Sequence, residues 1–208
     1  DLTLTSYDNS ACSSTTRGIW AGGNYNNNVI QYITIASTGD ATDFGDLTLT
    51  RGNLAGCSSS TRGVFGGGFD SGFNRVNVID YVTIASAGNA TDFGDLTVAR
   101  NDDGACSNST RGVFAGGQGV SANVNTIDYI TIASTGNATD FGDLLLTLAN
   151  LAACSSTTRA VFGGGSTGAL QNVIQYVTID TTGNSLDFGD LISANYELSA
   201  TSNVHGGL

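Results

Sequence analysis

The chain has no lysine, no methionine and no proline, and it has a single histidine, His205, and a single tryptophan. One histidine cannot build the multi-histidine clusters of most catalytic zinc sites, and no nucleophile elbow or phosphate-binding loop is present. The four cysteines form no Cys-x-x-Cys pair, the usual spacing of a structural zinc site. We therefore expect no catalytic residues, no metal site and no cofactor.

The absence of lysine leaves seven arginines as the only basic residues, against 18 acidic residues, for a net charge of −11. Nucleic-acid binding needs a clustered basic surface. Here four arginines recur at one position of a repeat, and only Arg51, Arg75 and Arg100 lie elsewhere. We expect no nucleic-acid partner.

Long apolar runs are also missing. No stretch approaches the roughly 20 consecutive apolar residues that cross a bilayer, so we expect no membrane insertion. Because the chain lacks methionine and begins inside a repeat at Asp1, we interpret it as a processed product or a fragment.

Four near-copies of one segment make up almost the whole chain. Counted from the aspartate of each Asp-Leu pair, successive units are spaced 45, 49, 48 and 47 residues apart. The differences fall in one loop after a glycine-rich stretch, which has 5, 9, 8 and 7 residues in the successive units. A constant frame with one variable loop is typical of a scaffold that presents a variable surface. The units of this single repeat domain, 1–208, are residues 1–45, 46–94, 95–142 and 143–189, with 190–208 as a partial fifth unit or a closing strand.

The second unit shows the strand pattern of every unit. Small residues fill Ala55–Ser59, an apolar segment runs over Arg62–Gly66, and Val78–Ile84 alternates β-branched and aromatic residues with a period of two. A last segment, Thr91–Thr97, contains the sequence DFGDL. The pattern predicts an all-β protein with four short strands in each unit, the small-residue strand being the innermost.

The order of these features resembles the kelch repeat of β-propellers: an apolar strand, paired glycines, a variable loop, a strand with a central tyrosine, and an aromatic residue before the last strand. This resemblance implies a β-propeller of four-stranded kelch-like blades, with four complete repeats plus the start of a fifth. The DFGDL form of the repeat is also similar to arrays in structural proteins of marine bacteriophages, which implies a virion appendage component located on the virion or at an extracellular surface. The matching residues are Phe65, Gly66, Gly67, Tyr81 and Phe93 in the second unit, with Arg100 as the basic residue that follows soon after, and Trp20, Gly22, Gly23, Tyr32 and Phe44 in the first.

The sequence is compatible with two arrangements of the blades. Either the units belong to a larger ring of about five to seven blades, or four blades close with residues 190–208 overlapping at the seam. An open array exposes strand edges, so a homo-oligomer or a larger assembly is also expected to be possible.

The recurring polar residues have structural interpretations. We expect the repeated arginines, Arg17, Arg62, Arg111 and Arg159, to pair with DFGDL carboxylates such as Asp92 or Asp95. Calcium binding by those carboxylates is the alternative, although their spacing matches no calcium loop. The cysteines stand at equivalent positions too far apart for disulfides, so we interpret them as reduced, small buried residues.

Variation between units gathers on one predicted face, made of the variable loops and the segments that link successive units. Aromatic rings beside amides and carboxylates suit sugar faces or a protein surface, although ordinary solvated loops would also vary freely. The candidate binding residues on this face are Tyr7, Tyr25, Asn26, Phe69, Asp70, Phe73, Asn74, Arg75, Asn101, Asp102, Gln118 and Tyr196.

These observations favour a non-enzymatic protein that attaches to a host receptor or glycan through its variable loops. The alternatives are a purely structural fibre or shell component, which binds other structural subunits, and a kelch-like protein–protein interaction module.

Overall fold

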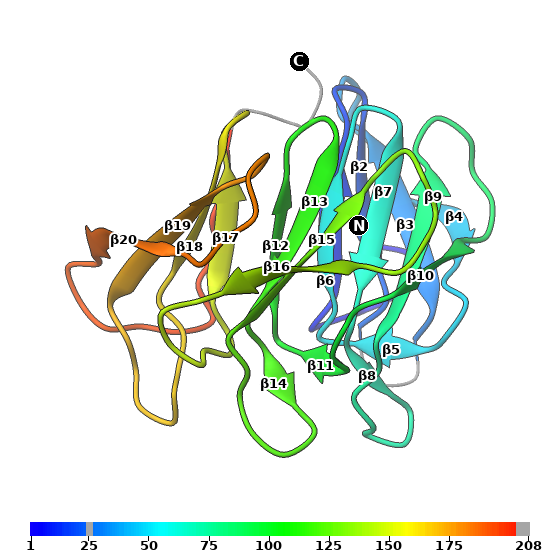
Figure 1. The fold of residues 1–208 in the computed structure, drawn as a ribbon. Helices are drawn as coiled ribbons and strands as arrows, with labels where there is room; N and C mark the ends of the chain where they lie inside the picture. The colour runs from blue at the N-terminus through cyan, green and yellow to red at the C-terminus, as the bar shows by residue number, and fades with distance from the viewer. Residues whose placement is uncertain (24–26, 203–208) are drawn as a thin grey trace.

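The computed structural model describes residues 1–23 and 27–202. It contains twenty β-strands, and no helix occurs in these residues (Figure 1). The predicted all-β class is confirmed. Each of the four complete units contributes its own sheet of four antiparallel strands, as its sequence pattern indicates.

Within each sheet the four strands follow one another in chain order. In the first unit they are β1 (Ser10–Ser13), β2 (Arg17–Ala21), β3 (Val29–Thr34) and β4 (Thr42–Asp46), and in the second β6 (Ala55–Ser58), β7 (Arg62–Gly66), β9 (Val78–Thr83) and β10 (Thr91–Asp95). In the third they are β12 (Gly104–Ser107), β13 (Arg111–Ala115), β15 (Thr126–Thr131) and β16 (Thr139–Asp143), and in the fourth β17 (Ala152–Ser155), β18 (Arg159–Gly163), β19 (Val173–Thr178) and β20 (Leu186–Asp190).

Two additional sheets of two short strands lie at one end of the molecule (Figure 1). β5 (Arg51–Gly52) pairs with β8 (Phe69–Asp70), and β11 (Arg100–Asn101) pairs with β14 (Gln118–Gly119). These pairs join the linking segment of a unit to the variable loop of the same unit, which the sequence pattern did not predict.

The first strands of the four sheets lie next to one another, in the order β1, β6, β12 and β17. Their small residues line a central hollow of about 160 Å³. The cysteines of the first two of these strands point at the next sheet: an added Cβ on Gly63 would lie 2.7 Å from the sulfur of Cys12, and one on Gly112 would lie 2.7 Å from that of Cys57. At these two positions a side chain beside the arginine of the second strand would meet a cysteine sulfur, whereas the fourth unit has Ala160 at the equivalent position.

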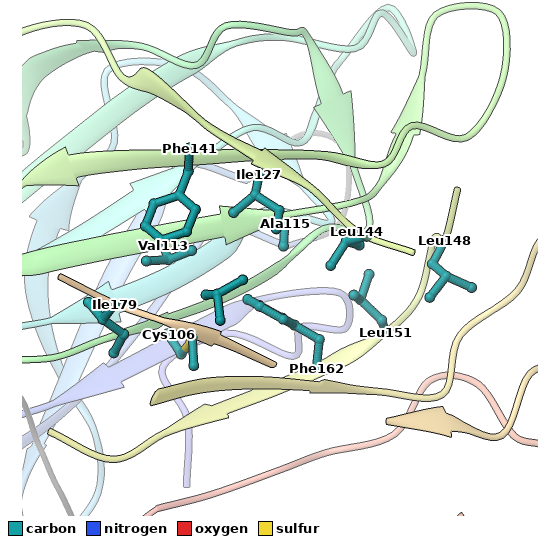
Figure 2. Close-up of a cluster of buried hydrophobic side chains, with 12 residues drawn as sticks. Cys106, Val113, Ala115, Ile127, Phe141, Leu144, Leu148, Leu151, Phe162 and Ile179 are labelled. Atoms are coloured by element: carbon teal, nitrogen blue, oxygen red, sulfur yellow. The ribbon is translucent and has the colours of Figure 1, made fainter. Parts of the chain in front are cut away.

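The hydrophobic core lies between successive sheets. The cluster between the third and fourth units contains Val113, Ile127 and Phe141 from one sheet and Phe162 and Ile179 from the next (Figure 2). Equivalent clusters join the first unit to the second and the second to the third. In the two middle units the third strand has buried residues on both faces of the sheet. This explains why apolar residues occur at successive positions of the strand rather than only at every second one.

The DFGDL sequence forms a β-bulge in the last strand of every sheet. In the second unit the register shifts between Asp92 and Gly94, and Phe93 packs edge-on against Tyr81 with ring centroids 5.8 Å apart. Gly94 has a φ of 142°, and an added Cβ would lie 2.5 Å from the backbone of Gly136 in the next unit. The glycine thus permits both the bulge and the close approach of the next unit's turn.

The expected pairing of the repeated arginines with DFGDL carboxylates is wrong. The Arg62 guanidinium stacks on the Tyr81 ring, 4.5 Å from its centroid, and its Nη1 donates to the carbonyl of Ile132 in the next unit at 2.9 Å. Arg17 and Arg111 make the same two contacts in their units. A cation–π contact and a bond to a carbonyl at the sheet boundary satisfy the guanidinium without a carboxylate.

The four sheets follow one another in an arc, and the described residues do not form a closed ring (Figure 1). Residues 190–202 continue from β20, and Ala200, Thr201 and Ser202 line the same central hollow as the four first strands.

Candidate functional site

The loop of the second unit carries five of the twelve predicted binding residues and is held by hydrogen bonds within the loop. The carboxylate of Asp70 accepts hydrogen bonds from the backbone nitrogens of Gly72 and Asn74, both at 2.8 Å, and from the Asn74 amide. These bonds from Asn74 hold the pKa of Asp70 below its ordinary value. The backbone of Phe73 has a φ of 61°, an unusual conformation for a large residue, and its ring is 59% exposed.

Arg75 joins this loop to the loop of the third unit. Its guanidinium carbon lies 5.1 Å from the centroid of the Phe69 ring, and its Nη2 donates to the side-chain oxygen of Gln118 at 2.8 Å. The Phe69 ring meets Phe73 edge-on with centroids 6.5 Å apart. One unit further, the amide of Asn123 donates to the carbonyl of Ser166 at 2.8 Å, so the loops of three successive units are linked.

A fully buried arginine holds the base of the loop in the second unit. The Nη1 of Arg51 donates to the carbonyls of Gly67 and Val78, both at 2.6 Å, and these residues flank the variable segment. Its Nη2 forms an ion pair with Asp80 at 2.9 Å and also donates to the carbonyl of Phe65. Burial lowers the pKa of the Arg51 guanidinium, while the Asp80 charge opposes that shift. The loop is thus closed at its base by charge-assisted hydrogen bonds in a fully buried site.

The third unit repeats the buried ion pair, but the Nη1 of Arg100, which corresponds to the loop-closing Nη1 of Arg51, has no hydrogen-bond partner among the described residues. Arg100 forms an ion pair with Asp128 at 2.9 Å and donates to the carbonyl of Phe114 at 3.2 Å. The Arg100 Nε also lies 3.6 Å from the carboxylate of Asp103, which is too long for a good hydrogen bond. Asp103 is buried, and burial raises its pKa to about 7.

Next to these loops the linking segments form a polar rim around one end of the central axis. Five residues at equivalent positions adopt left-handed backbone conformations with φ between 53° and 57° and line a hollow of about 180 Å³. Four backbone hydrogen bonds of 2.8 to 3.1 Å link them in series, each donated by the amide of one residue to the carbonyl of the residue before it in the series. These five rim residues are Asp8, Asn53, Asp102, Asn150 and Glu197.

Asp102 connects the rim to the loops. Its carboxylate accepts a hydrogen bond from the amide of Asn53 in the preceding unit. Burial raises the pKa of Asp102, the Asn53 bond and the nearby Arg75 charge lower it, and the Asp8 and Glu197 carboxylates raise it further. Asp102 is therefore a partly buried carboxylate that is influenced by the charges of Asp8 and Glu197 in the rim and of Arg75 in the second loop.

The structure brings six predicted residues together, which we call the loop surface: Phe69, Asp70, Phe73, Asn74, Arg75 and Gln118. Asp102 borders the loop surface from the rim. Asn101 is completely buried beneath the face, because its backbone pairs with Gln118 in the β11–β14 sheet. Tyr7 and Tyr196 are exposed on the linking segments of the first and fifth units, away from this group. Tyr25 and Asn26 lie outside the described residues.

Sequence reasoning missed the buried arginines, which it assigned to the varying linking segments. The signal is a correlation between units. Arginine stands five residues after the first aspartate of the unit only where the middle of the third strand carries aspartate, as in Arg51 with Asp80 and Arg100 with Asp128. The other two units have Gln31 and Gln175 at the strand position.

Among the described residues, no group of three or more histidine, cysteine or acidic side chains is arranged to hold a metal ion. In the same part of the chain, no helix is long and apolar enough to cross a membrane. No protein-family model matches the chain, and no curated protein is similar to it in sequence.

Proposed function

We propose that this chain is a non-enzymatic attachment protein, a kelch-like β-propeller whose loop surface binds a receptor or glycan. The observation that carries the proposal is the way the two longest variable loops are held. A buried arginine ion pair lies beneath each loop. Arg51 closes the base of the second unit's loop through its bonds to Gly67 and Val78, and Arg75 and Gln118 join the two loops across the sheet boundary.

Solvated loops that vary freely would not need a buried ion pair at each base. Ordering a loop before binding removes part of the entropic cost of association, so a preformed surface increases affinity. The same architecture places an exposed phenylalanine, Phe73, on a backbone conformation that points away from the fold's own core. An exposed ring held in this way is more consistent with recognition than with folding.

The chemistry of the loop surface suits a neutral sugar or a protein surface. Phe69 and Phe73 offer ring faces and edges, and Asn74, Gln118 and Asp70 offer amide and carboxylate groups for hydroxyls or backbone amides. A polyanionic ligand is disfavoured because the net charge is −11 and Asp70 and Asp102 add carboxylates to the loop surface and its border.

The resemblance to phage repeat arrays supports a place on a virion or at an extracellular surface. A purely structural role in a fibre or shell is the second candidate, and the exposed apolar faces at the two ends of the arc favour it. The two functions differ in whether the loop surface matters.

The test is binding of the fluorescently labelled chain to an array of immobilised oligosaccharides and to a panel of whole bacterial cells. Phe73→Ala and Arg75→Ala should each lower affinity for any bound probe by about tenfold or more, because removal of an anchor residue costs more than about 1.4 kcal/mol. Thr135→Ala, on the turns at the opposite end of the sheets, is the matched control and should bind like the unaltered chain. Binding that is equal for all three variants would remove the loop surface from the function, and no binding to any probe would favour the structural role.

A further inference from the structure

The three interfaces between successive sheets are built from the same residues. The large aromatic residue of each second strand packs against the small residue that ends the second strand of the preceding unit. For example, an added Cβ on Gly66 would come within 2.8 Å of the Phe114 ring. Ile84, Ile132 and Ile179, one from each following unit, are at most 1% exposed in these interfaces.

The two outer faces of the arc carry the same residues without a neighbour. On the fourth sheet Phe188 is 54% exposed, whereas its equivalents Phe44, Phe93 and Phe141 are 2 to 3% exposed. On the first sheet Ile35 is 52% exposed, although its equivalents in the other three units are the buried isoleucines described above.

Steric and polar features of these two faces also indicate that each lacks a neighbouring sheet. The nearest atom to an added Cβ on Gly163 is 3.8 Å away, so the position that receives an aromatic ring in other interfaces is open. Trp20 is only partly buried, while its equivalents Phe65, Phe114 and Phe162 are completely buried. Arg159 stacks on Tyr176 like the other repeated arginines, but among the described residues it has no next unit whose carbonyl it could reach.

The first-strand positions of five units surround the central hollow, whereas the outer strands of only four units are present among the described residues. The central hollow is lined by the first strands of four units and by Ala200–Ser202, which stand at the first-strand position of a fifth. Asp8 of the first unit and Glu197 of the fifth line the same rim hollow. A second copy of the chain carries four sheets, whereas these positions call for the outer strands of one unit.

We propose that the two outer faces receive a single fifth sheet of this same repeat, which continues from Ala200–Ser202 and closes a five-bladed ring. Its second strand would place an aromatic residue against Gly163 and a glycine or alanine against Trp20. Its third strand would cover Phe188 with an isoleucine and offer a backbone carbonyl to Arg159. The inference rests on the propeller architecture proposed above and is independent of the attachment role.

The experiment compares the 208-residue chain with an extended chain, in which Ser202 is followed by a second copy of residues 59–94. The second unit is chosen because the Gly66 of the added copy leaves space for the Trp20 indole and its Phe65 can pack against Gly163. Trp20 is the only tryptophan, so its fluorescence reports burial at the outer face of the first sheet. We expect the extended chain to melt about 5 °C higher or more, and its Trp20 emission to shift to the blue with acrylamide quenching reduced to that of a buried indole.

Two controls keep the result specific. An extension carrying V82S and I84S cannot pack on the fourth sheet and should give neither change. In the 208-residue chain Gly163→Leu should leave the melting temperature unchanged while Gly66→Leu lowers it, and in the extended chain Gly163→Leu should abolish the gain. Trp20 that stays accessible in the extended chain would overturn the five-bladed ring. Protection of Trp20 in a dimer of the 208-residue chain would show instead that a second copy covers these faces.

Discussion

The two middle units and the two outer units carry different residues at one buried position. At the centre of the third strand the middle units have Asp80 and Asp128, and the outer units have Gln31 and Gln175. In every unit this side chain accepts a backbone hydrogen bond from the segment after the Asp-Leu pair, for example from Thr48 at 3.2 Å and from Leu145 at 2.7 Å. The acceptor is therefore part of the frame.

The ion pair is an addition to that frame. Arg51 and Arg100 occur only in the middle units, where they bind the same carboxylate oxygen that accepts the backbone hydrogen bond and where the variable loops have 9 and 8 residues rather than 5 and 7. Because Leu148 replaces the arginine in the fourth unit and the sheet still forms, the sheet does not need the charge. The comparison indicates that the buried arginine serves the long loop above it.

The largest expected effect comes from converting a middle unit to an outer one. Arg51→Leu alone leaves Asp80 buried without its partner and should lower the free energy of unfolding by about 3–5 kcal/mol. The double variant R51L/D80Q copies the Leu148 and Gln175 pair of the fourth unit and should recover most of that loss. Chemical denaturation of the three proteins measures both values. A double variant as unstable as the single one would show that the pair is required by the sheet itself.

A second difference between units is Asp103, which stands where the second, fourth and fifth units have Leu54, Leu151 and Leu198. Its folded-state pKa of about 7 exceeds the ordinary value of 3.8, so between about pH 4 and pH 7 the folded chain holds a proton that the unfolded chain has lost. Stability should therefore fall as pH rises through this window, by at most about 4 kcal/mol, and level off above it. Asp103→Asn should flatten the profile measured by thermal or chemical unfolding, and the account of this residue fails if the slope is unchanged.

The fold could be predicted from sequence because every unit repeats the same local signals. The alternation in Val78–Ile84, the small residues of Ala55–Ser59 and the paired glycines each predicted a strand or a turn that the structure contains. The repetition also made the length variation of one loop visible. Closure of the ring stays a proposal, since the described sheets form an open arc.

Contacts between units could not be predicted in the same way. The repeated arginines were assigned to carboxylates within reach in the sequence, but the closest acceptors are carbonyls of the next unit, such as that of Ile132 for Arg62. Arg51 and Arg100 were read as surface variation because a charged residue in a variable segment is usually solvated. Only the correlation with Asp80 and Asp128 distinguishes them, and it is visible when the units are compared position by position.

The smallest effect concerns the cysteines, which also divide into middle and outer. Cys57 and Cys106 are buried, whereas Cys12 and Cys154 are only partly covered. Burial raises the pKa of Cys12 to about 12 and raises that of the other three thiols, so all four should be poor nucleophiles at neutral pH. Labelling with iodoacetamide followed by mass spectrometry should modify Cys154 first and leave Cys57 and Cys106 unmodified until unfolding. Equal labelling of all four would mean that the middle interfaces open readily.

If the long loops form a fixed surface in the free protein, their backbone amides should be protected from hydrogen exchange. In the loop of the second unit the amides of Asp70, Phe73 and Val76 donate to backbone carbonyls at 3.0 Å, and the amides of Gly72 and Asn74 donate to the Asp70 carboxylate. We predict that peptides covering residues 68–76 exchange much more slowly than an unstructured chain, and that R51L/D80Q removes most of this protection while the strands keep theirs. Exchange at the rate of an unstructured chain in the unaltered protein would show that the loop is disordered before binding. That result would contradict the proposal that Arg51 holds the loop in a fixed conformation.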